Sequence, residues 1–151
     1  QFMPLYQTTA LWISTHTFPK ATLTGQGLKI MASDNIEMLR ALGSDPLVIK
    51  KTRVDAIYGL TNLMDQAFEA ASELKGPLLV LYGERDEVIP RKPIMEMLSK
   101  LPEKAKESLK VILYDKGYHM LMRDLQAETV WRDIRHWIEA RNKLPLVATK
   151  R

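Results

Sequence analysis

Residues 77–90 have the sequence PLLVLYGERDEVIP, and this stretch decides the fold class. It begins with a short, uninterrupted apolar run that ends at Gly83, which is typical of a strand buried on both faces of a parallel sheet. Residues 109–114, LKVILY, predict a second strand. Helices are predicted over 92–101 and 126–141, one after each strand. This order of strand, helix, strand and helix is typical of an open parallel sheet covered by helices.

The preceding part of the chain predicts helices instead of strands. Apolar and aromatic residues suit a helix over 4–16, which Pro19 ends. Over about 53–73 apolar residues recur at the spacing of one helix face. We therefore expect two regions, a helical one over 1–75 and an α/β one over 76–151.

Two capping patterns predict further helix starts in the helical region. Ser33 or Asp34 can accept hydrogen bonds from the unpaired amides of a helix that begins there. Asp45 followed by Pro46 is a second start, with a cap and a proline in the first turn. Residues 20–32 contain two glycines and predict an irregular connection.

The composition excludes several classes of function. Lys and Arg number 22 against 18 Asp and Glu, and these charges are interspersed, so we expect no nucleic-acid partner. The chain has no cysteine, which excludes disulfides, thiolate metal sites and cysteine nucleophiles. The three histidines lack metal-ligand spacing, so the sequence predicts no metal site.

The ends and the apolar runs of the chain bear on its location. No stretch reaches the roughly 20 apolar residues that span a bilayer, and the first residues lack the pattern of a secretory signal. We therefore expect a cytoplasmic protein, with peripheral membrane association left open. The chain begins at Gln1 instead of a methionine, so we expect it to be part of a longer gene product.

One carboxylate and one imidazole follow the two predicted strands. Asp86 lies three residues beyond the first strand, and His119 lies in the loop after the second. Because the carboxyl ends of adjacent parallel strands meet at one sheet edge, we expect the two loops to come together. A carboxylate that accepts from one imidazole nitrogen stabilises the imidazolium formed when the other nitrogen takes up a proton. The nearby Arg123 and Asp124 are expected to form a local ion pair.

Three segments resemble a known family. LLVLYGERDEVIP and LYDKGYHMLMRD resemble the acid-bearing and histidine-bearing segments of α/β-hydrolases. Within that fold they are most similar to monoacylglycerol lipases, lysophospholipases and related serine aminopeptidase S33-like hydrolases. Residues 33–67 resemble the helical cap that this branch inserts ahead of the acid-bearing strand. The resemblance implies the C-terminal half of an α/β-hydrolase, with parallel strands and covering helices over 76–151 and a helical cap over 1–75.

The family's nucleophile does not occur in the chain. It is a serine in a G-x-S-x-G turn ahead of the cap, and none of the six serines has glycine at both −2 and +2. The resemblance therefore implies that Asp86 and His119 serve a serine from a missing N-terminal half. We expect that half, or a second copy of the chain in an oligomer, as a partner. We expect this chain alone to be inactive, and to self-associate or be poorly stable.

The resemblance also implies a substrate. It implies esters of lipids such as monoacylglycerols or lysophospholipids, cleaved through an acyl-enzyme without a cofactor. Trp12 and Met64 are candidate substrate-binding residues, because the family's cap covers an apolar chain and flexible thioethers suit alkyl groups. His136 is interpreted as structural, whereas His16 lies in the expected cap, where a substrate contact is left open. The alternative is a non-catalytic fragment, or a lipid-binding or interaction module.

Overall fold

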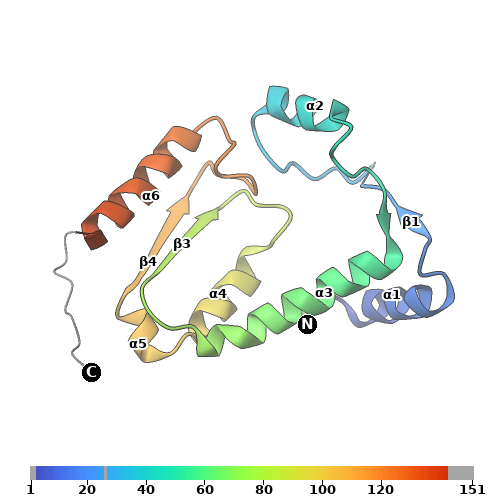
Figure 1. Cartoon of the computed structure of the whole chain (residues 1–151), viewed down its shortest axis with the longest axis horizontal. Helices are drawn as coiled ribbons and strands as arrows, with labels where there is room; N and C mark the ends of the chain where they lie inside the picture. Colours follow the sequence, from blue (N-terminus) through green and yellow to red (C-terminus); the bar gives the residue numbers. More distant parts are fainter. Residues whose placement is uncertain (1–2, 26, 143–151) are drawn as a thin grey trace.

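A parallel pair of strands forms the centre of the molecule. The computed structural model describes residues 3–25 and 27–142, and Figure 1 shows their arrangement. Strands β3 (Leu78–Gly83) and β4 (Leu109–Tyr114) pair in register, from Leu78 opposite Leu109 to Gly83 opposite Tyr114. Both strands predicted from the sequence are confirmed, and so is their parallel direction.

Three helices complete the α/β region. Helices α4 (Arg91–Lys100) and α5 (Glu103–Lys106) form the crossover between β3 and β4, and α6 (Ala127–Asn142) lies beside β4 (Figure 1). The Tyr114 hydroxyl at the end of β4 donates to Asp133 Oδ2 of α6 at 2.9 Å, which fixes that helix to the strand. The helices predicted over 92–101 and 126–141 are confirmed. The short α5 follows Pro102 and was not predicted.

The apolar residues of α6 are buried over only part of the helix. Ala127 is 6% exposed and Val130 is fully buried. Trp131 and Ile138 lie further along the helix, and 54% and 47% of their surfaces are exposed. The first turns of α6 therefore anchor the helix to the rest of the region.

The preceding region is helical, as the sequence predicts. It contains α1 (Leu5–Thr17), α2 (Ile36–Ser44) and α3 (Val54–Ala70), and a single 3₁₀ turn, η1 (Ala71–Glu73), continues α3. Helix α1 packs against α3 on the side of the molecule away from α6 (Figure 1). Across the described ranges, no helix is both long enough and apolar enough to cross a membrane.

The connection expected to be irregular contains a short strand. Strand β1 (Thr22–Leu23) pairs antiparallel with β2 (Thr52–Arg53), the segment that immediately precedes α3. The two-residue pairing ties the end of the α1 connection to the start of α3. A ladder this short has no periodicity in the sequence that could predict it.

The first predicted capping pattern is wrong by one or two residues. Asn35 caps α2, since its side-chain oxygen accepts from the Met38 amide at 3.1 Å. Ser33 and Asp34 instead make hydrogen bonds to residues 91 positions later in the chain. The physical reason is tertiary, because these distant partners compete with the local helix end for the same side chains.

The second predicted start, at Asp45 and Pro46, is also wrong. The Asp45 carboxylate accepts from the Leu47 amide at 2.8 Å, which closes a turn instead of a helix. The chain then continues to β2, and the next helix begins only at Val54. Aspartate stabilises both structures by the same kind of side-chain hydrogen bond, so the dipeptide alone does not distinguish them.

Two glycines bring the loops beyond β3 and β4 into contact. A Cβ on Gly83 would lie 2.4 Å from the carbonyl carbon of Gly117, and one on Gly117 would lie 2.4 Å from Leu121 Cδ2. Neither position has room for a methyl group against its neighbours. The contact between Gly83 and Gly117 therefore brings together the acid loop (residues 84–90) and the histidine loop (residues 115–126) at a point where both backbones lack a side chain.

We expect Gly83→Ala to lower the free energy of unfolding by about 1–3 kcal/mol, because the added methyl group forces backbone apart. The control is Gly59→Ala in the middle of α3, where a Cβ meets nothing within 4 Å. That change should raise stability by about 0.5–1 kcal/mol, since alanine favours a helix over glycine. Urea denaturation followed by circular dichroism compares the two, and equal effects would contradict the close-contact account.

Candidate active site

The acid loop orients the carboxylate of Asp86. Its Oδ1 accepts from the backbone amides of Val88 at 2.8 Å and Ile89 at 2.9 Å. The side chain is only 8% exposed. Two amide donors on Oδ1 fix the side chain and direct the second oxygen, Oδ2, towards the histidine loop.

The structure brings His119 to that second oxygen. His119 Nδ1 lies 3.0 Å from Asp86 Oδ2, although the two residues are 33 positions apart. An ionised carboxylate can only accept hydrogen bonds, so Nδ1 carries the proton and donates it. The imidazole is 37% exposed and lines a cavity together with Leu81 of β3 and Ile134 of α6. The other nitrogen, Nε2, therefore keeps a lone pair on a side chain that solvent reaches.

This pair has the geometry of a general base with its orienting acid. The hydrogen bond from Nδ1 selects one tautomer and prevents the ring from turning. When Nε2 takes up a proton, the carboxylate 3.0 Å from Nδ1 stabilises the imidazolium. The arrangement can therefore accept a proton from a nucleophile and return it to a leaving group.

Tyr82 supports the acid loop from β3. Its hydroxyl donates to the carbonyl oxygen of Ile89 at 2.9 Å, and the residue is only 5% exposed. Burial raises the pKa of Tyr82, and the charge of Asp86 raises it further. The phenol therefore stays protonated and keeps donating to the loop. The sequence analysis did not identify Tyr82, although its place at the end of a buried strand is a usable indication.

An apolar cavity of about 270 Å³ lies between α1, α3 and α4. Ile89 lines it, and the amide of the same residue donates to Asp86. The cavity wall and the acid are thus joined through a single residue of the acid loop. Most of the remaining lining consists of apolar, thioether and aromatic side chains, including Leu11, Tyr58, Met64, Phe68, Ile94 and Met97.

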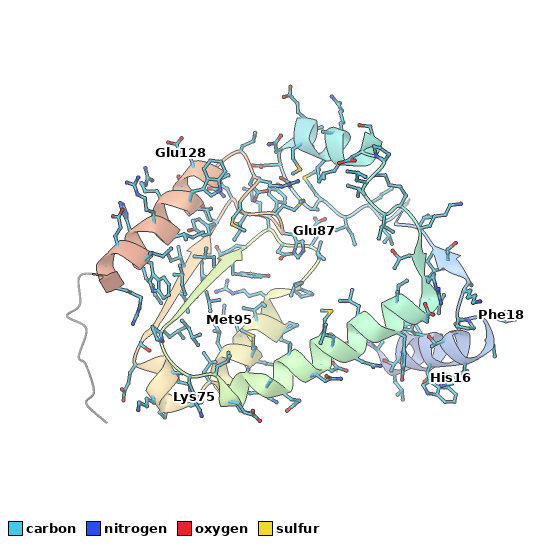
Figure 2. All side chains as sticks on the ribbon, in the orientation of Figure 1. His16, Phe18, Lys75, Glu87, Met95 and Glu128 are labelled. Atoms are coloured by element: carbon cyan, nitrogen blue, oxygen red, sulfur yellow. The ribbon has the colours of Figure 1, made fainter. Side chains whose placement is uncertain are left out.

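The two residues predicted to bind substrate lie in different places. Met64 lines the apolar cavity, whereas Trp12 lies outside its lining. The Trp12 ring packs on the ring of His16 with centroids 4.3 Å apart, and the backbone carbonyl oxygen of Trp12 lies 2.7 Å from His16 Nδ1. Figure 2 shows His16 far from Glu87 of the acid loop. A substrate contact by Trp12 stays a prediction that this cavity does not support.

Asp124 does not have the local surroundings predicted for it. The expected ion pair with Arg123 is replaced by hydrogen bonds from the Ser33 hydroxyl at 2.6 Å and the Tyr118 amide at 2.8 Å. Asp124 is 3% exposed, and its neighbour in sequence is exposed. Sequence reasoning missed this buried cluster, because its members are far apart in the chain.

The structure offers little for a metal ion. The described ranges contain no group of three or more His, Asp and Glu side chains that could hold one.

Comparisons with known proteins place the chain among hydrolases. The family model described as serine aminopeptidase, S33, matches residues 1–126. A search of curated proteins gave no match. The monoacylglycerol lipase of Paleococcus ferrophilus is similar in structure with a TM-score of 0.75 and 23% identity, over 91% of this chain and 53% of the lipase.

A second solved structure has the same fold. It is described as a soluble variant of monoglyceride lipase from Saccharomyces cerevisiae in complex with a substrate analog, with a TM-score of 0.71 and 15% identity. The match covers 90% of this chain and 49% of that one. The chain thus spans about half the length of the solved structures it matches, and it has the fold of part of an α/β-hydrolase.

We expect Asp86→Asn to reverse the tautomer of His119. The amide oxygen can still accept from Val88 and Ile89, which turns the amide nitrogen towards the imidazole. Because that nitrogen only donates, His119 Nδ1 must accept and the proton must move to Nε2. ¹⁵N NMR of the histidine side chains at mildly alkaline pH measures the change, and the exposed His136 is the internal control. Retention of the Nδ1–H tautomer in the variant would contradict the geometry.

Proposed function

The chain belongs to the serine aminopeptidase S33 family of hydrolases, and we propose that it supplies the acid and the base of a lipid esterase. The substrates proposed are carboxylic esters such as monoacylglycerols or lysophospholipids. The observation that carries the proposal is the position of Ile89, which donates to Asp86 and also lines the apolar cavity. An acyl chain in that cavity lies next to the loop that holds the acid.

The proposed mechanism is acyl transfer through a serine ester. A serine hydroxyl attacks the ester carbonyl carbon while His119 Nε2 takes the hydroxyl proton, and the protonated imidazole then gives that proton to the leaving alcohol. Water attacks the acyl-enzyme by the same route and releases the fatty acid. Asp86 holds His119 and stabilises its charged form throughout. These steps need no cofactor.

The serine is proposed to come from outside these 151 residues, because none of the six serines lies in a G-x-S-x-G turn. The proposed source is an N-terminal half of the same hydrolase, in a longer parent or in a partner chain. A second copy of this chain is proposed only as an oligomer partner, because it would carry the same six serines. In this account residues 1–75 form the cap and residues 76–151 the C-terminal part of the core. The chain by itself should then be inactive.

The apolar cavity supports a substrate with an acyl chain. Its lining includes thioether and aromatic side chains from α3 and α4, and such adaptable surfaces suit flexible alkyl groups. Two solved structures with this fold are described as a monoacylglycerol lipase and a monoglyceride lipase. We also propose peripheral contact with membranes or micelles, where such substrates reside.

A second candidate function is lipid binding without catalysis. The same cavity favours it, since the cavity can hold an acyl chain whether or not a serine reaches His119. The two candidates differ in one respect only, which is the hydrolysis of an ester by a species that contains His119.

The first test measures ester hydrolysis and intact mass on one purified sample, with a p-nitrophenyl ester and a monoacylglycerol as substrates. If activity is found, His119→Ala and Asp86→Asn should each lower kcat/KM by about 10³-fold or more, because triad members act as a unit. The control is His136→Ala, which changes an exposed histidine on α6 and should leave activity unchanged.

If activity is lost in His119→Ala, the mass spectrum of the active sample should show a second protein species, the one that supplies the nucleophilic serine. Activity that survives His119→Ala would overturn the assignment of the base. Binding of lipid by a pure, inactive chain would favour the second candidate function.

The second test concerns the cavity. Met64→Trp should weaken binding of a long-chain monoacylglycerol by about tenfold, because a bulkier side chain occupies the space of the acyl chain. Leu63→Trp places the same side chain one position away on an exposed part of α3 and should bind as the unchanged protein does. Displacement of a fluorescent fatty acid measures both, and equal affinities would argue against this cavity as the acyl site.

A further inference from the structure

A five-residue segment before α2, which we call the clasp (residues 31–35), bridges the acid loop and the histidine loop. Every residue of the clasp makes a hydrogen bond to one of these loops. One bond goes to the acid loop, where the Met31 amide donates to Glu87 Oε2. The other four go to the histidine loop. There the Ala32 carbonyl accepts from the Met120 amide and the Ser33 hydroxyl donates to Asp124. The Asp34 carboxylate accepts from the Leu125 amide, and the Asn35 side-chain amide donates to the Arg123 carbonyl.

The bond between Ser33 and Asp124 is the buried part of the clasp. Ser33 has no exposed surface and Asp124 is 3% exposed. Ser33 Oγ lies 2.6 Å from Asp124 Oδ1, and the other carboxylate oxygen accepts from the Tyr118 amide at 2.8 Å. A buried carboxylate that loses either donor is left without compensation for its burial. We therefore expect both hydrogen bonds to Asp124 to persist in the folded protein.

The residues on either side of His119 are both held by backbone hydrogen bonds. Tyr118 precedes it and is held through its amide by Asp124, while Met120 follows it and donates to the carbonyl of Ala32 at 3.0 Å. The clasp also holds Glu87, the neighbour of Asp86, through the Met31 amide at 2.8 Å. One short segment thus holds the backbone beside the base and bonds to the Glu87 side chain beside the acid.

We propose that Ser33 and Asp124 are positioning residues that hold the imidazole of His119 in register with Asp86. Neither side chain touches the imidazole, and both act through the backbone of Tyr118 and the clasp. The inference rests on the proposed function only where it links the position of His119 to catalysis. The position itself can be measured without substrate. The proposal also makes the clasp, which leads into α2, part of the structure that supports the site.

The test uses the full chain labelled with ¹⁵N-histidine and follows the Nδ1 proton of His119 by NMR. In Ser33→Ala and in Asp124→Ala this proton should exchange with water at least about tenfold faster, because a buried partner is removed and the histidine loop loosens. Asp124→Asn should behave as the unchanged chain does. Its amide can accept from the Tyr118 amide and donate to the Ser33 hydroxyl, which restores both bonds without the charge.

The matched control is Tyr114→Phe, which also removes a hydroxyl bonded to a carboxylate but lies between β4 and α6. It should lower the melting temperature without changing the His119 signal. Faster exchange in both alanine variants, with recovery in Asp124→Asn, supports the proposal.

Two results would overturn it. One is a lowered melting temperature in the alanine variants with unchanged His119 exchange, since that indicates a role in stability alone. The other is an Asp124→Asn variant that behaves like Asp124→Ala. Ser33→Ala removes a single hydroxyl, so it provides the measurement if Asp124→Ala does not fold. No substrate is needed, so a failed esterase assay and a failed positioning test are separate findings.

Discussion

The contact between Gly83 and Gly117 is the constraint on which the site depends. Parallel pairing of β3 with β4 brings the acid loop and the histidine loop to one edge. The backbones meet there without room for a side chain, because a Cβ on Gly83 would lie 2.4 Å from the carbonyl carbon of Gly117. In this arrangement His119 Nδ1 lies 3.0 Å from Asp86 Oδ2. A close backbone contact thus accompanies the meeting of the two side chains.

Two buried aspartates have different parts in this arrangement. Asp86 is oriented by amides of its own loop and offers one oxygen to His119, whereas Asp124 uses both oxygens to join the histidine loop to the clasp. The clasp belongs to the helical region, so that region contributes to the site through the backbone as well as through the cavity. The cavity in turn reaches the acid through Ile89. The cavity, the Asp86 carboxylate and the His119 imidazole are therefore parts of one connected structure.

The sequence predicted the elements of the α/β region well, because their causes are local. An uninterrupted apolar run ended by Gly83 has few structures open to it other than a buried strand. The capping residue of α2 and the helix start at Asp45 were predicted wrongly for the opposite reason. Aspartate and serine side chains bond to whichever donor is near, and at these positions the donors are a distant loop and a local turn. Local patterns therefore identified the strands, but they did not identify these caps.

The sequence by itself determined the two side chains that carry the proposed chemistry, because each follows a predicted strand and the carboxyl ends of parallel strands share an edge. It also marked Met64 as a candidate for an apolar site. Only the tertiary structure decided that Trp12 lies outside the cavity lining and that Asp124 bonds to Ser33 instead of pairing with Arg123. The reason is physical: period and turn chemistry act over a few residues. A hydrogen bond between residues 91 positions apart depends on how the whole chain folds.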